Sequence, residues 1–210
     1  GSSVWIGWCD SGCTDNSNWN YEQIQDSATT LSDACPAPGG KVVAIGTQGS
    51  NNDGVAYLLS GGTFSSSPTA VGVTRPRRCW VANSGEMLVA ADNAIAHYDG
   101  SGFSSDATDP VTWVGGAAVP GYDWAVSSGP EVGEGPSWSV TTVGTNIHNI
   151  YAAVQAASTL TWGFGGSNLS SPQILWKFDG TNWAAASPDL SGFKLVNAAL
   201  KTGDGTRYFA

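Results

Sequence analysis

The chain has 210 residues, of which only 12% are charged, and its formal net charge is −9. Its eight Lys and Arg residues are too few to form the basic face with which nucleic-acid-binding proteins displace counterions, so nucleic acid is excluded as a partner. No apolar run reaches the length of about 18 residues that a membrane-spanning helix needs, so we expect no membrane insertion. The 28 glycines favour short strands joined by tight turns, which predicts an all-β fold.

A short pattern recurs five times along the chain: an apolar stretch ends in a small turn, and an aromatic residue opens the next segment. In chain order, these aromatic residues are Trp19, Phe64, Phe103, Trp138 and Trp183. They are 45, 39, 35 and 45 residues apart. A period of about 40 residues built from short strands predicts a propeller array.

The segment 78–105 is the clearest repeat. It is expected to contain four antiparallel strands, at 79–82, 86–91, 94–98 and from Phe103 onward. A tight turn at Asp92–Asn93 is predicted between the second and third strands, and the Asp99–Gly100 pair is a strong hairpin signal before the fourth. Four such strands make one propeller blade.

The two ends of the chain are expected to share one blade. The segments 194–199 and 206–210 are predicted to be its first two strands, and the segment that begins at Val4 supplies the others. Such a join would remove two exposed sheet edges. We therefore predict a single domain, residues 1–210, folded as a β-propeller of about five four-stranded blades. The N- and C-terminal strands close the ring in one blade.

The third repeat is the least regular. Its strands must fit between Val111 and Val126, and its turn lies within 127–136. Four blades with one long insertion is therefore the alternative architecture. A further insertion is expected at 156–172, which delays the third strand of the next repeat until 173–176.

The four cysteines are expected to form disulfides. Cys9 and Cys13 lie in one turn region, which makes a local bridge plausible, and Cys35 and Cys79 occupy comparable positions of successive repeats. The alternative is four unpaired, buried thiols. Disulfides would place the protein in an oxidising compartment. The two histidines are isolated in the sequence, so no metal site is expected.

Catalytic residues are not expected. Asp10, Asp99 and Asp179 occupy equivalent turns in different repeats, and they are best explained as turn formers. The chain has no nucleophile elbow, phosphate loop or zinc motif. The innermost strands are expected at 111–114 and 140–143, which carry no Asp or Glu that could act in a glycosidase. We predict a protein that is not an enzyme and has no cofactor.

Ten tryptophans are far more than a chain of this length usually holds. Several are expected to fill the wedge-shaped gaps between blades, but an exposed indole could stack on a sugar ring. The candidates for ligand contact are Trp113, Trp124, Trp162 and Trp176. Arg77 and Arg78, in the one basic cluster, are candidates for contact with an anionic sugar or an acidic subunit; the alternative is a solvated connector paired with nearby acids.

Motifs such as Tyr98-Asp99-Gly100 and Phe178-Asp179-Gly180 resemble the repeats of secreted bacterial and phage propellers. In repeat period and blade count, the whole chain resembles five-bladed propellers, including the tachylectin-type lectins. That resemblance implies binding of N-acetylated sugars at one site per blade.

The leading prediction is a secreted or extracellular, non-enzymatic protein that binds carbohydrate or another cell-surface ligand. The first alternative is a structural subunit of a virion or extracellular assembly, whose partners are other protein subunits. The second alternative is a glycan-active hydrolase, which clustered, channel-facing carboxylates would favour.

Overall fold

A computed structural model describes the chain at residues 4–9, 11–12, 14–24, 29–119, 121–129, 131–142, 149–157, 160–166, 173–178, 183–190, 200–201 and 208–209. In these ranges the long elements are all β-strands, and the helical elements are two 3-10 turns, η1 (Asn16–Asn18) and η2 (Pro38–Gly40). The predicted all-β class is confirmed. Within the described part of the chain, no helix has the length and apolar character needed to cross a bilayer.

The strands are short and follow one another closely along the chain. In order, they are β1 (Val4–Trp8), β2 (Asn20–Ile24), β3 (Thr29–Ala37), β4 (Lys41–Gln48), β5 (Asp53–Ser60), β6 (Thr63–Phe64), β7 (Thr69–Val81), β8 (Met87–Tyr98), β9 (Phe103–Val119), β10 (Tyr122–Ser127), β11 (Glu131–Gly135), β12 (Ser139–Thr142), β13 (Asn149–Ala157), β14 (Leu160–Gly166), β15 (Gln173–Phe178), β16 (Trp183–Leu190), β17 (Leu200–Lys201) and β18 (Tyr208–Phe209).

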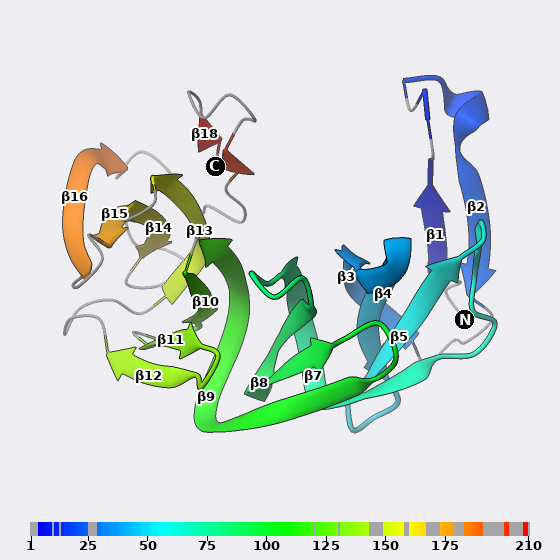
Figure 1. Ribbon diagram of the computed structural model, residues 1–210, viewed down its shortest axis with the longest axis horizontal. Helices are drawn as coiled ribbons and strands as arrows, with labels where there is room; N and C mark the ends of the chain where they lie inside the picture. The colour runs from blue at the N-terminus through cyan, green and yellow to red at the C-terminus, as the bar shows by residue number, and fades with distance from the viewer. Residues whose placement is uncertain are drawn as a thin grey trace.

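These strands form four antiparallel sheets. The largest has ten strands, in the order β12-β11-β10-β9-β8-β7-β5-β4-β3, with β6 paired to β5. A second sheet has the order β13-β14-β15-β16, and two small sheets pair β1 with β2 and β17 with β18. Figure 1 shows the strands following one another along an arc, with β1 and β2 at one end and β13 to β18 at the other.

The ten-stranded sheet consists of three successive four-stranded units, because its long strands change partners midway. The start of β7 pairs with β5 and its end with β8, while the start of β9 pairs with β8 and its end with β10. The first unit is thus β3, β4 and β5, with β6 and the start of β7 together forming its fourth strand along β5. The third unit is the end of β9 with β10, β11 and β12. The middle unit comprises the end of β7, both halves of β8 and the start of β9.

The predicted turn at Asp92–Asn93 lies inside β8, which is assigned as one strand. Residues 87–90 of β8 pair with β7, and residues 94–98 pair with β9. The change of partner therefore falls where the turn was expected, and Asn93 there has a positive φ of 60°. Asn tolerates this left-handed conformation better than most residues do.

Apolar side chains fill the spaces between successive units. Within β8, Met87 and Val89 belong to the cluster shared with the first unit, whereas Leu88 and Ala90 belong to the cluster shared with the third. Successive side chains of a strand point to opposite faces, so this alternation buries both faces of the middle unit. A third cluster joins the first unit to β1 and β2.

The predicted disulfide between Cys35 and Cys79 is confirmed. It joins β3 to β7, and thus two neighbouring units, across a Cα–Cα distance of 5.9 Å. Beside it, the Cys79 N–H donates to Asp33 Oδ2 at 3.1 Å. Cys9 is also disulfide-bonded, and Cys13 lies outside the described residues.

Two expectations about strands need correction. Ser139–Thr142 forms β12, the fourth strand of the third unit, and is therefore not the first strand of a repeat, which was expected to be innermost. The expected insertion at 156–172 contains β14, which pairs with both β13 and β15. In β14, glycines alternate with large residues. The alternation is typical of a strand, but the high glycine content led to the prediction of a loop. The third strand of that repeat does begin at Gln173, as predicted.

Closure of the ring by the chain ends is not found in the described residues. β1 pairs with β2, and β18 pairs with β17, in separate sheets.

Candidate functional site

Two of the predicted ligand-binding tryptophans are core residues. Trp113 is 0% exposed, and its Nε1–H donates to Thr108 Oγ1. Trp124 is 3% exposed and stacks on Tyr122. Neither indole can stack on a ligand, because each fills space inside or between units, so the prediction for these two residues is corrected. Trp176 is half-buried, and the side chain of Trp162 lies outside the described residues.

The arginines of the basic cluster are paired with acids of the same chain. Arg77 Nη2 lies 3.0 Å from Asp92 Oδ1, and Arg75 Nη1 lies 3.7 Å from Asp92 Oδ2. Arg78 Nη1 is 3.9 Å from Asp33 Oδ1. These contacts match the connector alternative, since the positive charges are largely compensated within the chain.

A row of polar residues crosses six strands beside this cluster. Each member lies directly opposite the next on the neighbouring strand. From β3 to β9, the row is Thr29, Gln48, Asp53, Thr74, Asp92 and Thr112. Directly opposed residues carry their side chains on the same face of a sheet. The pairing therefore gathers polar groups that are far apart in the sequence.

Three members of this polar row, Gln48, Asp53 and Thr74, line an open hollow of about 510 Å³. The rest of its lining is apolar or glycine: Gly54, Val55, Pro68, Ala70, Gly72 and Val73. The hollow thus combines an amide, a carboxylate and a hydroxyl with an apolar wall.

The backbone beside the hollow depends on Gly54. A Cβ at this position would lie 2.5 Å from Val73 O, so only glycine allows β5 and β7 to approach this closely. The register between the two strands shifts between Asp53 and Val55. The Arg75 N–H donates to Asn52 O at 2.9 Å, which ties the turn before β5 to the connection after Thr74.

The Asp53 side chain is exposed, and in the described part of the chain it forms no ion pair or side-chain hydrogen bond. By contrast, Asp92 in the same row is held by two arginines. The lining therefore offers one uncommitted carboxylate. This arrangement can accept hydrogen bonds from ligand hydroxyl groups, but it lacks the pair of carboxylates that glycoside hydrolysis uses.

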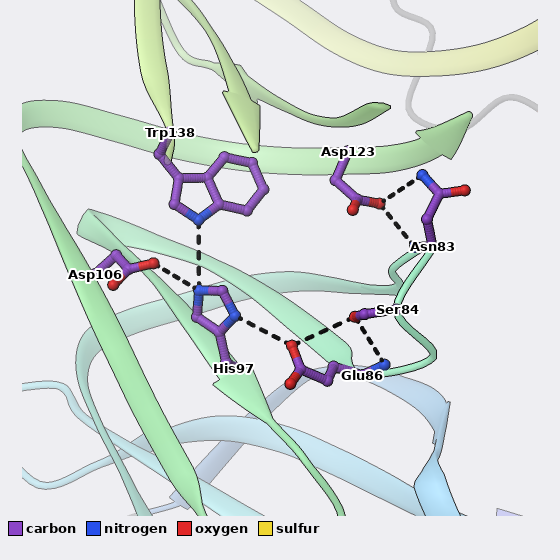
Figure 2. A network of polar contacts seen from close by, with 7 residues as sticks. All are labelled: Asn83, Ser84, Glu86, His97, Asp106, Asp123 and Trp138. Carbon is purple, nitrogen blue, oxygen red and sulfur yellow. Dashed lines mark hydrogen bonds and ion pairs between the residues drawn. The ribbon is translucent and has the colours of Figure 1, made fainter. Parts of the chain in front are cut away.

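A second group of polar residues surrounds His97, which is 18% exposed (Figure 2). Its Nε2 lies 2.9 Å from Asp106 Oδ2, and its Nδ1 lies 3.6 Å from Glu86 Oε2. Trp138 Nε1 lies 3.4 Å from His97 Nε2. Both ring nitrogens are thus engaged, which leaves little of the imidazole to contact a ligand.

The same region joins the second and third units through Asn83. Its backbone N–H donates to Asp123 Oδ1 at 2.9 Å, and its side-chain Nδ2 donates to Tyr122 O at 2.8 Å. Figure 2 shows the contact between Asn83 and Asp123 beside the His97 group. We interpret the Asn83 contacts and the His97 contacts as structural: they hold together the strands around the apolar cluster between these units. The sequence did not reveal them, because Asn83 and Asp123 are 40 residues apart.

Asp99 is a turn former, as predicted. Its Oδ1 accepts hydrogen bonds from the N–H groups of Gly102 and Ser101 and from the Ser101 hydroxyl. These bonds favour the charged form and lower the pKa of Asp99 to about 2. Asp10 and Asp179 lie outside the described residues.

Several solved structures are similar to this chain. A functionally unknown protein from Desulfotomaculum acetoxidans has a TM-score of 0.59 at 11% identity, over 96% of this chain and 67% of its own. The Dos1 propeller has a TM-score of 0.57 at 10% identity, over 97% of this chain and 58% of its own. The fold is a β-propeller.

A third similar structure is the extracellular domain of the putative hybrid two component system BT4673 from B. thetaiotaomicron. Its TM-score is 0.51 at 10% identity, over 87% of this chain and 31% of that one. The chain thus spans about a third to two thirds of the length of these structures. No protein-family model matches the chain, and no curated protein matches it in sequence. Identities this low establish the fold alone.

In propeller terms, the four-stranded units are blades, and the hollow lies in the first blade at the tip of the hairpin between β4 and β5. The polar row continues from this tip to Asp92 in the second blade and Thr112 in the third. Sequence reasoning missed Gln48, Asp53 and Thr74, because only the register between strands places them together.

Proposed function

We propose that this propeller is a non-enzymatic protein that binds carbohydrate in the hollow lined by Gln48, Asp53 and Thr74. The observation that carries the proposal is the exposed Asp53 carboxylate, which has no partner in the described residues and stands in a hollow with an apolar wall. Ligand sites commonly combine apolar walls with a few polar groups that orient the ligand.

The chemistry of the lining suits a neutral sugar. A carboxylate can accept hydrogen bonds from two hydroxyl groups, and bonds to a charged acceptor are stronger than neutral ones. The Gln48 amide and the Thr74 hydroxyl can both donate and accept, and the partly exposed Pro68 and Val73 offer an apolar surface to the C–H face of a sugar ring. An anionic ligand would be repelled by Asp53 and by a net charge of −9.

A glycan array followed by calorimetric titration of each hit tests this proposal. Asp53→Asn should weaken binding by about 10- to 100-fold, because a hydrogen bond to a charged group is worth about 1.5–3 kcal/mol. Glu134→Gln is the matched control: it also removes one carboxylate, but on β11 and outside the hollow. A blank array, or equal losses in both variants, would contradict the proposal.

Absence of catalysis is part of the proposal. A glycosidase needs two carboxylates at a defined separation, and Asp53 is the one acid in the lining of the hollow. Chromatography of the array hits after long incubation with the protein should recover intact glycans. Released sugar would instead favour the hydrolase alternative.

An extracellular location is proposed on the disulfide between Cys35 and Cys79, because such bonds persist in oxidising compartments. The structural-subunit alternative is favoured by one observation, the exposure of Trp5 and Tyr21 on the β1–β2 hairpin. Light scattering over a range of protein concentrations separates a monomeric binding protein from a self-assembling subunit.

We further propose that the ring has five blades and is closed. Three blades make up the large sheet, and β13 to β16 form another. The two-stranded sheets β1–β2 and β17–β18 together have the four strands of a fifth blade.

A further inference from the structure

His97 lies at the edge of the contact between the second and third blades. Ile95 and His97 are two positions apart on β8, so their side chains share a face. Ile95 belongs to the apolar cluster between these two blades, whereas Ala96 and Tyr98 belong to the cluster on the other side. Ile95 is 0% exposed and the His97 side chain is 18% exposed. The imidazole therefore points toward the third blade, where the buried cluster meets solvent.

The third blade meets this imidazole with Trp138, which lies in the turn between β11 and β12. Trp138 is only 4% exposed and belongs to the same apolar cluster. Its Nε1 lies 3.4 Å from His97 Nε2, and the two ring centroids are 6.2 Å apart. On its other contact, it packs edge-on against Trp80 of the second blade, with centroids 6.3 Å apart. One aromatic ring of the third blade is thus held by an apolar and a titratable residue of the second.

The charged groups that contact His97 are two carboxylates of its own blade. Glu86 Oε2, just before β8, lies 3.6 Å from Nδ1, and Asp106 Oδ2, on β9, lies 2.9 Å from Nε2. In the part of the chain that the structure describes, no Lys or Arg contacts the ring. Nor do the acids on the described strands of the third blade, which are Asp123, Glu131 and Glu134. The ring therefore has acidic partners on both nitrogens, all from one blade.

His97 Nε2 faces two partners with opposite requirements. The indole N–H of Trp138 can only donate a hydrogen bond, and the Asp106 carboxylate can only accept one. Figure 2 shows the lines from both groups meeting at this one nitrogen. With a proton, Nε2 can donate to Asp106 but opposes the indole N–H. Without a proton, it can accept from Trp138 but opposes the carboxylate. The protonation state of Nε2 therefore decides which partner is bound.

We infer that His97 is a pH-dependent switch at the contact between the second and third blades. The doubly protonated ring donates to Glu86 and Asp106 within its own blade. Loss of the Nε2 proton to solvent releases Asp106, whose side chain is 53% exposed and can return to water, and Nε2 then accepts the Trp138 N–H across the blades. Histidine is the side chain whose charge ordinarily changes between about pH 5 and pH 8. The hydrogen bond between the blades is thus present near pH 8 and lost on acidification.

Nuclear magnetic resonance of the full chain labelled with ¹⁵N-tryptophan tests this inference, because it observes each indole N–H separately. The resonance that disappears in Trp138→Phe identifies Trp138. It should show one titration step between about pH 8 and pH 5. The step should be absent in His97→Gln, whose amide does not titrate. His148→Gln, which removes the other of the two histidines, is the matched control and should retain it.

The role of the carboxylate has its own readout. In Asp106→Asn, the midpoint of the step should move to lower pH, because the charged ring loses an acidic partner. A Trp138 resonance that does not change with pH, a step that persists in His97→Gln, or an unchanged midpoint in Asp106→Asn would each overturn the inference.

Thermal denaturation gives an independent measurement of the contact between the blades. Trp138→Phe removes the indole N–H, so it should lower the Tm more at about pH 8 than at about pH 5. When His97 is already replaced by Ala, the effect of Trp138→Phe should be the same at both pH values. Equal Tm losses at the two pH values in the presence of His97 would contradict the switch. The hollow with Asp53 lies in the first blade, so glycan binding can fail while this inference holds, and the reverse.

Discussion

Removal of the Cys35–Cys79 disulfide should cause a large loss of stability without changing the folded structure. The bond closes a loop with a sequence separation of 44 residues. In the chain-entropy description, a crosslink across such a loop destabilises the unfolded state by about 4 kcal/mol at 25 °C. A domain of this kind is stable by only about 5–15 kcal/mol, so the loss is a large fraction of the total.

The native geometry should survive without the bond, because other contacts hold the same strands together. The Ser32 hydroxyl donates to Pro76 O at 2.8 Å, and the Cys79 N–H donates to Asp33 Oδ2. The loss therefore arises mainly in the unfolded chain. Alanine is the suitable replacement at both positions, since serine would place a hydroxyl where Cys35 is only 7% exposed.

Urea denaturation of the Cys35→Ala/Cys79→Ala variant, followed by circular dichroism, measures the free energy of unfolding. We expect a loss of about 4 kcal/mol, which corresponds to a drop in Tm of roughly 10 °C. The control variant, Cys9→Ala/Cys13→Ala, removes two cysteines only four positions apart, so its loss should be clearly smaller. A loss below about 1 kcal/mol for the first variant would refute the chain-entropy argument.

Two further predictions concern single residues. Gly116→Ala should lower the free energy of unfolding by about 1–3 kcal/mol, because its Cβ would lie 2.4 Å from Trp80 Cζ2; Gly102→Ala, with no atom within 4 Å, is the control, and equal losses would argue against overpacking. Asp99 has a lowered pKa, so its stabilising effect should be present above its ordinary pKa of 3.8 and disappear as the pH falls toward 2. The Tm difference between wild type and Asp99→Ala should shrink over this range, and a difference that does not depend on pH would contradict the assignment.

Local sequence signals predicted much of the fold. The Asp99–Gly100 turn and the strand that begins at Phe103 are both present. Trp183 also begins a strand, as its equivalent position in the repeat required. Cys35 and Cys79 are bridged because equivalent positions of neighbouring repeats lie side by side. Each of these predictions depended on a turn or on the repeat period, which are properties of short segments.

Burial and strand order were harder to predict. The composition shows that tryptophans are numerous, but it does not show that Trp113 and Trp124 face the interior while Trp5 faces outward. Likewise, Ser139–Thr142 was expected to be the first strand of a repeat and is the fourth strand of the third unit. A strand residue can face either side, and a shift of one position exchanges the two faces.

The sequence by itself determined the all-β class, the spacing of the repeats and the turns that begin new strands, because turn chemistry acts over a few residues. The tertiary structure alone decided which polar groups meet. Gln48, Asp53 and Thr74 lie on three different strands, and their meeting depends on the register of β4, β5 and β7. Register is set by the packing of whole blades, so the candidate binding site emerges only when the strands are assembled.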